Sequence, residues 1–188
     1  MVRDAANRRV REAFEQLERE IAAGRPPSDD YDLRILRDGS WLYRGSPIER
    51  VAIVKLFASI LHRASDGSYW LVTPAERTRV HVEDVPFVGV ELAVRDAGAA
   101  QRLELRTNLG EWVPIDAAHP LVMKEQPDGA VAPYVDCGAG LEARVARNVF
   151  YELVELAEPE PEPGAGRLGV RSHGRWFPLG EDDGESAS

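Results

Sequence analysis

Four short glycine turns constrain the fold of this 188-residue chain more than any other feature. Each turn is followed within three residues by one of the four tryptophans: DGSW at Trp41, DGSYW at Trp70, NLGEW at Trp112 and SHGRW at Trp176. Glycine tolerates the positive φ angles that tight turns between antiparallel strands demand. The turns therefore predict β-hairpins, with Trp41 as a packing anchor at the start of a returning strand.

An amphipathic helix is predicted at the N-terminus, over residues 5–23. Its apolar residues recur at helical spacing on one narrow seam: Val10, Phe14, Leu17 and Ile21. Gly24 and the prolines that follow it are typical of a helix end. Two heptads are marginal for a free coiled coil, so we expect the seam to dock on the same chain. A contact with a second chain is the alternative.

Two further helices are predicted. Ser46 and Glu49 form a capping box around Pro47 and predict a helix from there to about His62, apolar on most sides and so expected to be covered on more than one face. Another is expected directly after the glycine loop CGAG, with a buried stripe along one side: Leu141, Val145, Val149, Phe150, Leu153 and Val154.

The order hairpin, helix, hairpin thus occurs twice, the second time with extra strands, which predicts a duplicated α+β module. Residues 157–166, AEPEPEPGAG, are expected to form a stiff extended linker loop inside the second module. The predicted divisions are an N-terminal helix (1–24), an N-terminal α+β domain (25–82), a C-terminal α+β domain (83–180) and a disordered acidic tail (181–188).

Charge and composition exclude several classes of function. The net charge of −9 comes mostly from acidic residues in the linker and the tail, so the rest is nearly neutral and has no basic stripe for DNA or RNA. A small anionic ligand stays compatible with this balance. No apolar run is long enough for a membrane span or a secretory signal, and the single cysteine, Cys137, fits a reducing compartment. We therefore expect a soluble, cytoplasmic protein.

Catalytic and metal-binding patterns do not emerge from the sequence. The four histidines fall in four different predicted elements without metal-ligand spacing, and Cys137 has no identifiable base. The chain is therefore expected to be no enzyme and to need neither metal nor cofactor. Gly138 and Gly140 precede a predicted helix, so they are candidates for an anion nest, with a glycine needed for close packing as the alternative.

Five segments, in their order along the chain, carry a family resemblance: DGSWLYRGSPIERVAIVKLFASIL, YWLVTPAERTRVHVEDVPFVGVELAV, LELRTNLGEWVPIDAAHPL, PYVDCGAGLEARVARNVFYELVELA and GVRSHGRWFPLG. Over residues 31–180 the chain resembles family twelve-eighty-five of the bacterial domains of unknown function. The resemblance implies a duplicated α+β core whose C-terminal half is similar to a pleckstrin-homology (PH) barrel. It further implies a nucleotide-like ligand between the halves and a role in signal transduction.

These considerations lead to a hypothesis of function. We expect a non-enzymatic sensor that binds a small anionic, nucleotide-like molecule in a cleft between the two modules. The candidate ligand-binding residues are Glu76, Arg77, Asp84, Phe87, Arg106, Asn108, Tyr134 and Arg144. For Arg106, a structural salt bridge is the favoured interpretation from the sequence alone. Two alternatives remain open: a protein-interaction scaffold that uses the PH-like half or the N-terminal helix, and an enzyme with Asp84 or Glu76 as general base.

Overall fold

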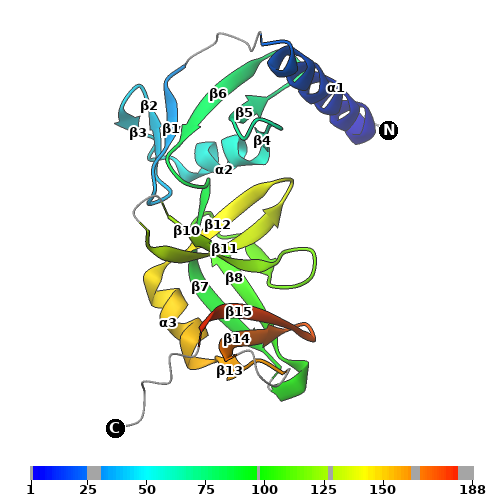
Figure 1. Ribbon diagram of the computed structural model, residues 1–188. Coiled ribbons are helices and arrows are strands. Elements are labelled where there is room, and N and C mark those ends of the chain that lie inside the picture. The colour runs from blue at the N-terminus through cyan, green and yellow to red at the C-terminus, as the bar shows by residue number, and fades with distance from the viewer. Residues whose placement is uncertain (1, 25–30, 97, 127–128, 162–165, 182–188) are drawn as a thin grey trace. The chain divides into compact units, whose positions relative to one another are not determined.

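A computed structural model describes residues 2–24, 31–96, 98–126, 129–161 and 166–181 (Figure 1). The chain divides into two compact units, one formed by Met1–Pro86 with Ala139–Leu141 and the other by Phe87–Gly138 with Glu142–Ser188. Pro26 and Pro27, part of the Glu-Pro linker and most of the acidic tail lie outside the described residues.

The first unit is built on a six-stranded sheet with the order β3-β2-β1-β6-β5-β4. Its elements are α1 (Val2–Ala22), β1 (Leu33–Ile35), β2 (Trp41–Tyr43), β3 (Ser46–Pro47), α2 (Val51–Ser59), β4 (Leu61–Arg63), β5 (Tyr69–Val72) and β6 (Arg77–Val82). Strands β1 and β6 pair in parallel, and the other neighbours are antiparallel. Two three-stranded meanders, β1-β2-β3 and β4-β5-β6, are thus joined through their first and last strands.

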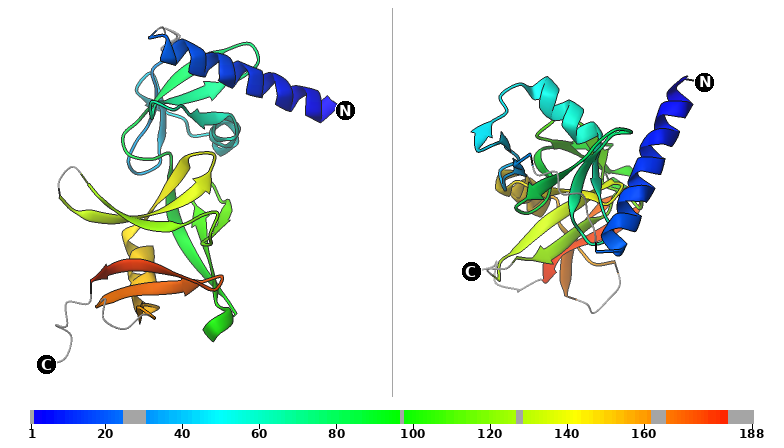
Figure 2. Two further views of the ribbon diagram at one scale, coloured as in Figure 1. Left: turned by 45° about the vertical axis from the view of Figure 1, so that its right-hand side comes forward. Right: turned by 90° about the horizontal axis from the view of Figure 1, so that it is seen from above.

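Strand β5 shows why this sheet carries a helix on each side. All four of its residues are buried, although successive side chains of a strand point to opposite faces. Trp70 and Val72 form a buried cluster with Leu17 of α1, whereas Leu71 lines the face toward α2. The two helices therefore cover opposite faces of the sheet (Figure 2), and the prediction that the N-terminal helix docks on its own chain is confirmed.

Polar contacts fix the position of α1 on this face. The Glu18 carboxylate accepts hydrogen bonds from the backbone N–H and the hydroxyl of Ser65, at 3.0 and 2.5 Å. Glu20 pairs with Arg77 of β6 at 3.1 Å. The Phe14 ring stacks on His62 of β4 with 4.8 Å between ring centroids. The apolar seam predicted from the sequence is thus reinforced by contacts to two strands, β4 and β6, and to the turn between β4 and β5.

Helix α2 differs from its prediction in both start and burial. Ser46 and Pro47 are the edge strand β3, paired with Tyr43 and Leu42 of β2, and the helix begins only at Val51. The capping box was the wrong interpretation because pairing to the β2 edge keeps this segment extended, and proline is tolerated on an edge strand. Within α2 only Val54 is buried. The prediction that this helix is covered on more than one face is therefore wrong.

Over its described residues, the second unit holds nine strands, one α-helix and one short 3-10 helix. A six-stranded sheet has the order β10-β11-β12-β7-β8-β9, and a separate three-stranded sheet has the order β13-β14-β15. The elements are β7 (Phe87–Arg95), η1 (Gly98–Ala100), β8 (Arg102–Thr107), β9 (Trp112–Pro114), β10 (Leu121–Glu125), β11 (Val131–Gly138), β12 (Leu141–Val145), α3 (Arg147–Glu155), β13 (Glu158–Pro159), β14 (Arg167–Ser172) and β15 (Arg175–Glu181).

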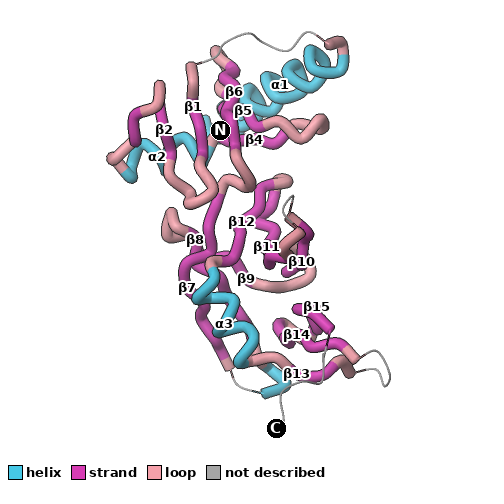
Figure 3. The backbone as a smooth tube through the Cα atoms, turned by 60° about the vertical axis from the view of Figure 1, so that its left-hand side comes forward, coloured by secondary structure: helices cyan, strands magenta, loops and turns pink. Residues whose placement is uncertain are grey.

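The two large sheets share one strand topology. In the second unit the meanders β7-β8-β9 and β10-β11-β12 are joined by parallel pairing of β12 with β7, as β6 joins β1 in the first. The predicted α+β fold class with two related modules is confirmed. The expectation that the two helices occupy matching places is wrong. Helix α2 connects the two meanders of its sheet, whereas α3 follows the second meander and lies beside β7 (Figure 3).

The predicted start of the last helix was also wrong. Leu141, Ala143 and Val145 form the strand β12 with alternating burial, and α3 begins only at Arg147. The helix then buries Val149 and Leu153 completely in a core with Val170 and Phe177 of the small sheet. Leu141, Val145, Val149 and Leu153 thus reach buried positions by a strand and then a helix, and Phe150 packs partly buried against the core. Val154 was wrongly predicted in the buried stripe, since it is 46% exposed.

The predicted turn SHGRW connects β14 to β15 through His173 and Gly174, both with positive φ. A different hairpin turn recurs in four places, and three of these are the turns predicted before Trp41, Trp70 and Trp112. In each, the first residue donates its N–H to the carbonyl four residues on, and a glycine with φ of 81–85° donates back to the first carbonyl. The turns begin at Leu36, Ala64, Thr107 and Gln126. In the first two, Asp38 accepts the Ser40 N–H, and Asp66 accepts the Ser68 hydroxyl and the Ser68 N–H; these hydrogen bonds lower the pKa of both carboxyls.

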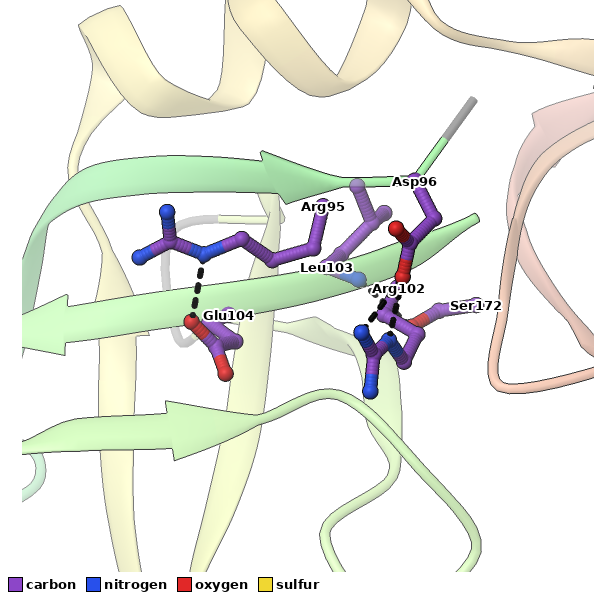
Figure 4. Close-up of polar contacts among 6 residues, drawn as sticks. All are labelled: Arg95, Asp96, Arg102, Leu103, Glu104 and Ser172. Carbon is purple, nitrogen blue, oxygen red and sulfur yellow. Dashed lines mark hydrogen bonds and ion pairs between the residues drawn. The ribbon is translucent and has the colours of Figure 1, made fainter. Parts of the chain in front are cut away.

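The small sheet is attached to the large sheet of the same unit through the start of β8. Ser172, fully buried at the end of β14, accepts the Leu103 N–H with its hydroxyl oxygen at 2.9 Å (Figure 4). Nearby, Arg95 pairs with Glu104 and Arg102 with Asp96 on the exposed side. Glu158–Pro159, expected to lie in a linker loop, form strand β13, and Glu181, expected in the tail, belongs to β15.

Candidate ligand-binding pocket

An open pocket of about 430 Å³ lies in the first unit, between α2 and the face of the sheet that α1 does not cover. Strands β1, β2, β5 and β6 contribute its floor, and α2 contributes the opposite wall. Eight of its eleven lining residues are aliphatic or aromatic: Tyr31, Leu33, Tyr43, Ile48, Ile53, Phe57, Ile60 and Leu71. The volume and the apolar lining are typical of sites for small organic molecules.

The depth of the pocket follows from the burial of its wall. Leu33 and Leu71 on the sheet are about 5% exposed, so they form a dry floor. Tyr31 and Tyr43 are 39% and 41% exposed and Ile53 of α2 is 36% exposed, so they form a rim at the surface. Covering apolar groups that are in contact with water at a concave site lowers the free energy, so it favours ligand binding there.

The polar groups of the pocket are Thr73, Glu76 and Thr78. Thr73 and Glu76 close the tight turn between β5 and β6, because the Thr73 hydroxyl oxygen accepts the Glu76 N–H at 2.9 Å. Residues 73–76 form a turn without helix. Within the described part of the chain, the Glu76 carboxylate makes no ion pair or hydrogen bond, and none of the lining residues is basic.

The other predicted residues of the first unit lie away from this pocket. Arg77 is next to Glu76 but points to the opposite face, where it pairs with Glu20 of α1. Asp84 lies 3.9 Å from the guanidinium of Arg37, in the bend that follows β6. Of the three candidates in this unit, only Glu76 contributes to the pocket.

Three candidates of the second unit gather around Val88 of β7. Phe87 precedes it, and Arg144 of β12 is its partner in the parallel ladder. The Asn108 side-chain oxygen accepts the Val88 N–H at 3.1 Å, and the Asn108 N–H donates to the Val88 carbonyl at 2.7 Å. Asn108 therefore holds the β8–β9 turn against β7, which is a structural role within the fold.

Arg106 and Tyr134 also have partners inside the fold. The Arg106 Nε lies 2.6 Å from Glu91 on the neighbouring strand, and its guanidinium lies over the Trp112 ring, so the salt bridge considered from the sequence is present. Tyr134 is 1% exposed and accepts a hydrogen bond from Gln126. Its burial leaves almost no surface for a ligand.

The glycine loop is a strand-to-strand turn. Gly138, Ala139 and Gly140 all have positive φ and connect β11 to β12. The argument for an anion nest relied on the positive end of a helix dipole, and no helix begins here. Gly138 donates its N–H to the Asp136 carboxylate at 2.6 Å. The dipole argument for this site is therefore wrong.

The described residues offer little support for a nucleophilic cysteine or for a metal-binding site. Burial, with the negative charges of Asp136 and Glu142, raises the pKa of Cys137 to about 12, so its thiol is protonated at neutral pH. Burial lowers the pKa of His62. Across the described ranges, no group of three or more His, Cys, Asp or Glu side chains is arranged to hold a metal ion.

Comparison with known proteins places the chain in a family. Residues 24–85 match the N-terminal domain of the proteins of unknown function DUF1285, and residues 86–179 match the C-terminal domain. The chain belongs to the DUF1285 family. Among the curated proteins, none matches it.

Two crystal structures of DUF1285 family proteins are similar to this chain. The protein from Silicibacter pomeroyi DSS-3 is 41% identical, covers 86% of this chain and 87% of its own, and has a TM-score of 0.77. The protein from Shewanella baltica OS155 is 31% identical, covers 65% of this chain and 90% of its own, and has a TM-score of 0.52. Within the described ranges of this DUF1285 protein, no helix is long and apolar enough to cross a bilayer.

Proposed function

We propose that this DUF1285 protein is a non-catalytic ligand-binding protein, and that its N-terminal module holds a small, mainly apolar molecule in the pocket under α2. The observation that carries the proposal is the incomplete burial of an apolar helix. Val51, Ile53 and Leu56 of α2 are 58%, 36% and 60% exposed, and Ile53 and Phe57 line a pocket with a dry floor. A ligand that fills this space removes apolar surface from water.

A sensor role in signal transduction, in the cytoplasm, is the biological setting that we propose for such a site. Binding would stabilise the module by tying α2 to the sheet, since α2 contributes one wall and the strands contribute the other. Ligands that bind the folded state alone raise its stability by mass action. The anionic nucleotide-like ligand remains a proposal as well, but the pocket under α2 does not favour it, because its one charged lining residue is acidic.

The proposal can be tested with a neutral apolar fluorophore, N-phenyl-1-naphthylamine, whose emission rises in apolar surroundings. We expect saturable binding to the wild type. The substitution Ile53→Asp places a charge at the rim and should weaken binding at least tenfold, because a carboxylate there must lose water when the probe enters.

Leu56→Asp is the matched control for Ile53→Asp. It puts the same charge on the same helix at a residue that is 60% exposed and does not line the pocket. Equal affinity of both variants, or no saturable binding by the wild type, contradicts the proposal.

Two other functions remain as alternatives. The seam of α1 is used within the chain, which leaves the PH-like half as the surface for a scaffold. An enzyme with Asp84 or Glu76 as general base would show turnover of a bound molecule that Asp84→Asn or Glu76→Gln abolishes. The absence of turnover for every ligand that binds would argue against that alternative.

A further inference from the structure

The charge of the pocket identifies the class of ligand that it can select, provided that the pocket binds ligands as proposed above. Glu76 is its one ionisable acidic lining residue, and no lining residue is basic. Of the neighbouring cations, Arg77 pairs with Glu20 on the far face of the sheet. Arg44 does not line the pocket but lies over the rim residue Tyr43, 5.2 Å from its ring centroid.

The position of Glu76 is set by the backbone. The Thr73 side chain accepts the Glu76 N–H, and the Thr73 hydroxyl and N–H both donate to the Glu76 carbonyl, at 3.1 and 2.9 Å. These bonds hold the residue at the mouth of the pocket and leave its carboxylate unused by the described part of the chain. A carboxylate held beside apolar walls attracts a cation and repels an anion.

We infer that the pocket takes an organic cation with an apolar body, such as a protonated amine that carries an alkyl or aryl group. The apolar body lies between α2 and the sheet, against Leu33, Phe57 and Leu71. The ammonium group lies at Glu76 and forms a charge-assisted hydrogen bond with it. Tyr31 at the rim favours the same class, because aromatic faces attract cations, whereas the Tyr43 ring already carries the Arg44 guanidinium.

Three probes of equal chain length separate charge from apolar burial: octylamine, octanol and octanoate at neutral pH, each used to displace N-phenyl-1-naphthylamine. We expect octylamine to bind wild type roughly two- to fivefold more tightly than octanol, the range for a solvent-accessible ion pair. Octanoate should bind more weakly than octanol. In Glu76→Gln the preference of octylamine over octanol should vanish, whereas the fluorophore should bind unchanged.

Glu49→Gln is the control for the change of net charge. Glu49 is exposed, lies in the same unit and does not line the pocket, so it should leave the preference for octylamine intact. Equal displacement by all three probes, tighter binding of octanoate, or an unchanged preference in Glu76→Gln overturns the inference. If the fluorophore itself does not bind wild type, the proposed function fails instead, so the two failures are distinguishable.

Discussion

Removing the buried end of one leucine tests whether α1 belongs to the folded N-terminal module. Leu17 is fully buried against Trp70, Val72 and Ala64. Leu17→Ala leaves a cavity at a site whose β-strand wall cannot collapse freely. Leucine-to-alanine changes of this kind cost about 2–5 kcal/mol, and we expect about 3 kcal/mol here. The loss is smaller if α1 leaves the sheet as a unit, because it cannot exceed the free energy of docking.

Urea denaturation followed by tryptophan fluorescence measures both outcomes. Trp70 is 1% exposed beneath α1, so undocking of the helix should shift its emission to the red before the module unfolds. Limited proteolysis within α1 should accelerate in parallel.

Leu56→Ala is the control, since Leu56 is 60% exposed and its truncation should cost less than about 0.5 kcal/mol. If Leu17→Ala costs no more than Leu56→Ala and leaves the emission unchanged, α1 does not dock on this sheet.

Two further predictions concern the C-terminal module. Ser172→Ala should lower the free energy of unfolding by about 1–3 kcal/mol, because the buried Leu103 N–H loses its acceptor; in urea denaturation, a loss as small as that of the exposed Ser59→Ala would contradict this. Cys137, with a pKa raised to about 12, should react slowly with a disulfide reagent at pH 8 in the folded protein and fast in urea. Because the folded state keeps the proton that the unfolded thiol releases near pH 8.5–9, stability should fall as pH rises from about 9 toward 12. Cys137→Ser should remove that slope, and a folded thiol as reactive as the unfolded one would refute the argument.

The sequence predicted the hairpins well because their turns are decided locally. Glycine at a positive φ, as at Gly39 and Gly67, is a requirement of the turn itself, and no distant residue changes it. The seam of α1 was also predictable, since Phe14, Leu17 and Ile21 recur at a spacing that only a helix places on one side.

Helix starts were predicted less well because the same local sequence pattern fits both a helix and a strand. Leu141 and Val145 are four residues apart, a spacing that fits one face of a helix but also, with Ala143 between them, one face of a strand. Pairing of β12 with β7 decides for the strand. Ser46 and Pro47 resemble a helix cap, but β2 offers them an edge to pair with. In both cases a contact distant in sequence decided the structure.

The pocket under α2 was missed because it depends on where the helix lies in the duplicated topology. In the second module the helix follows the last strand of the sheet and buries Val149 and Leu153 completely. In the first module the helix connects the two meanders, and only Val54 is buried. The sequence of α2 is the more apolar of the two, so its composition alone indicated the better-buried helix.

The more apolar helix, α2, is thus the less buried one, and this has a physical consequence. An apolar helix that lies over a sheet without filling the space beneath it keeps apolar surface in contact with water. Burial of this surface would supply the free energy of the ligand binding that we propose. Glu76 was a candidate from its place in the TPAER turn, and it is the one candidate of this unit that lines the space. The two modules thus share one strand topology but differ in the role of the helix: one helix completes a core, and the other forms the wall of an open pocket.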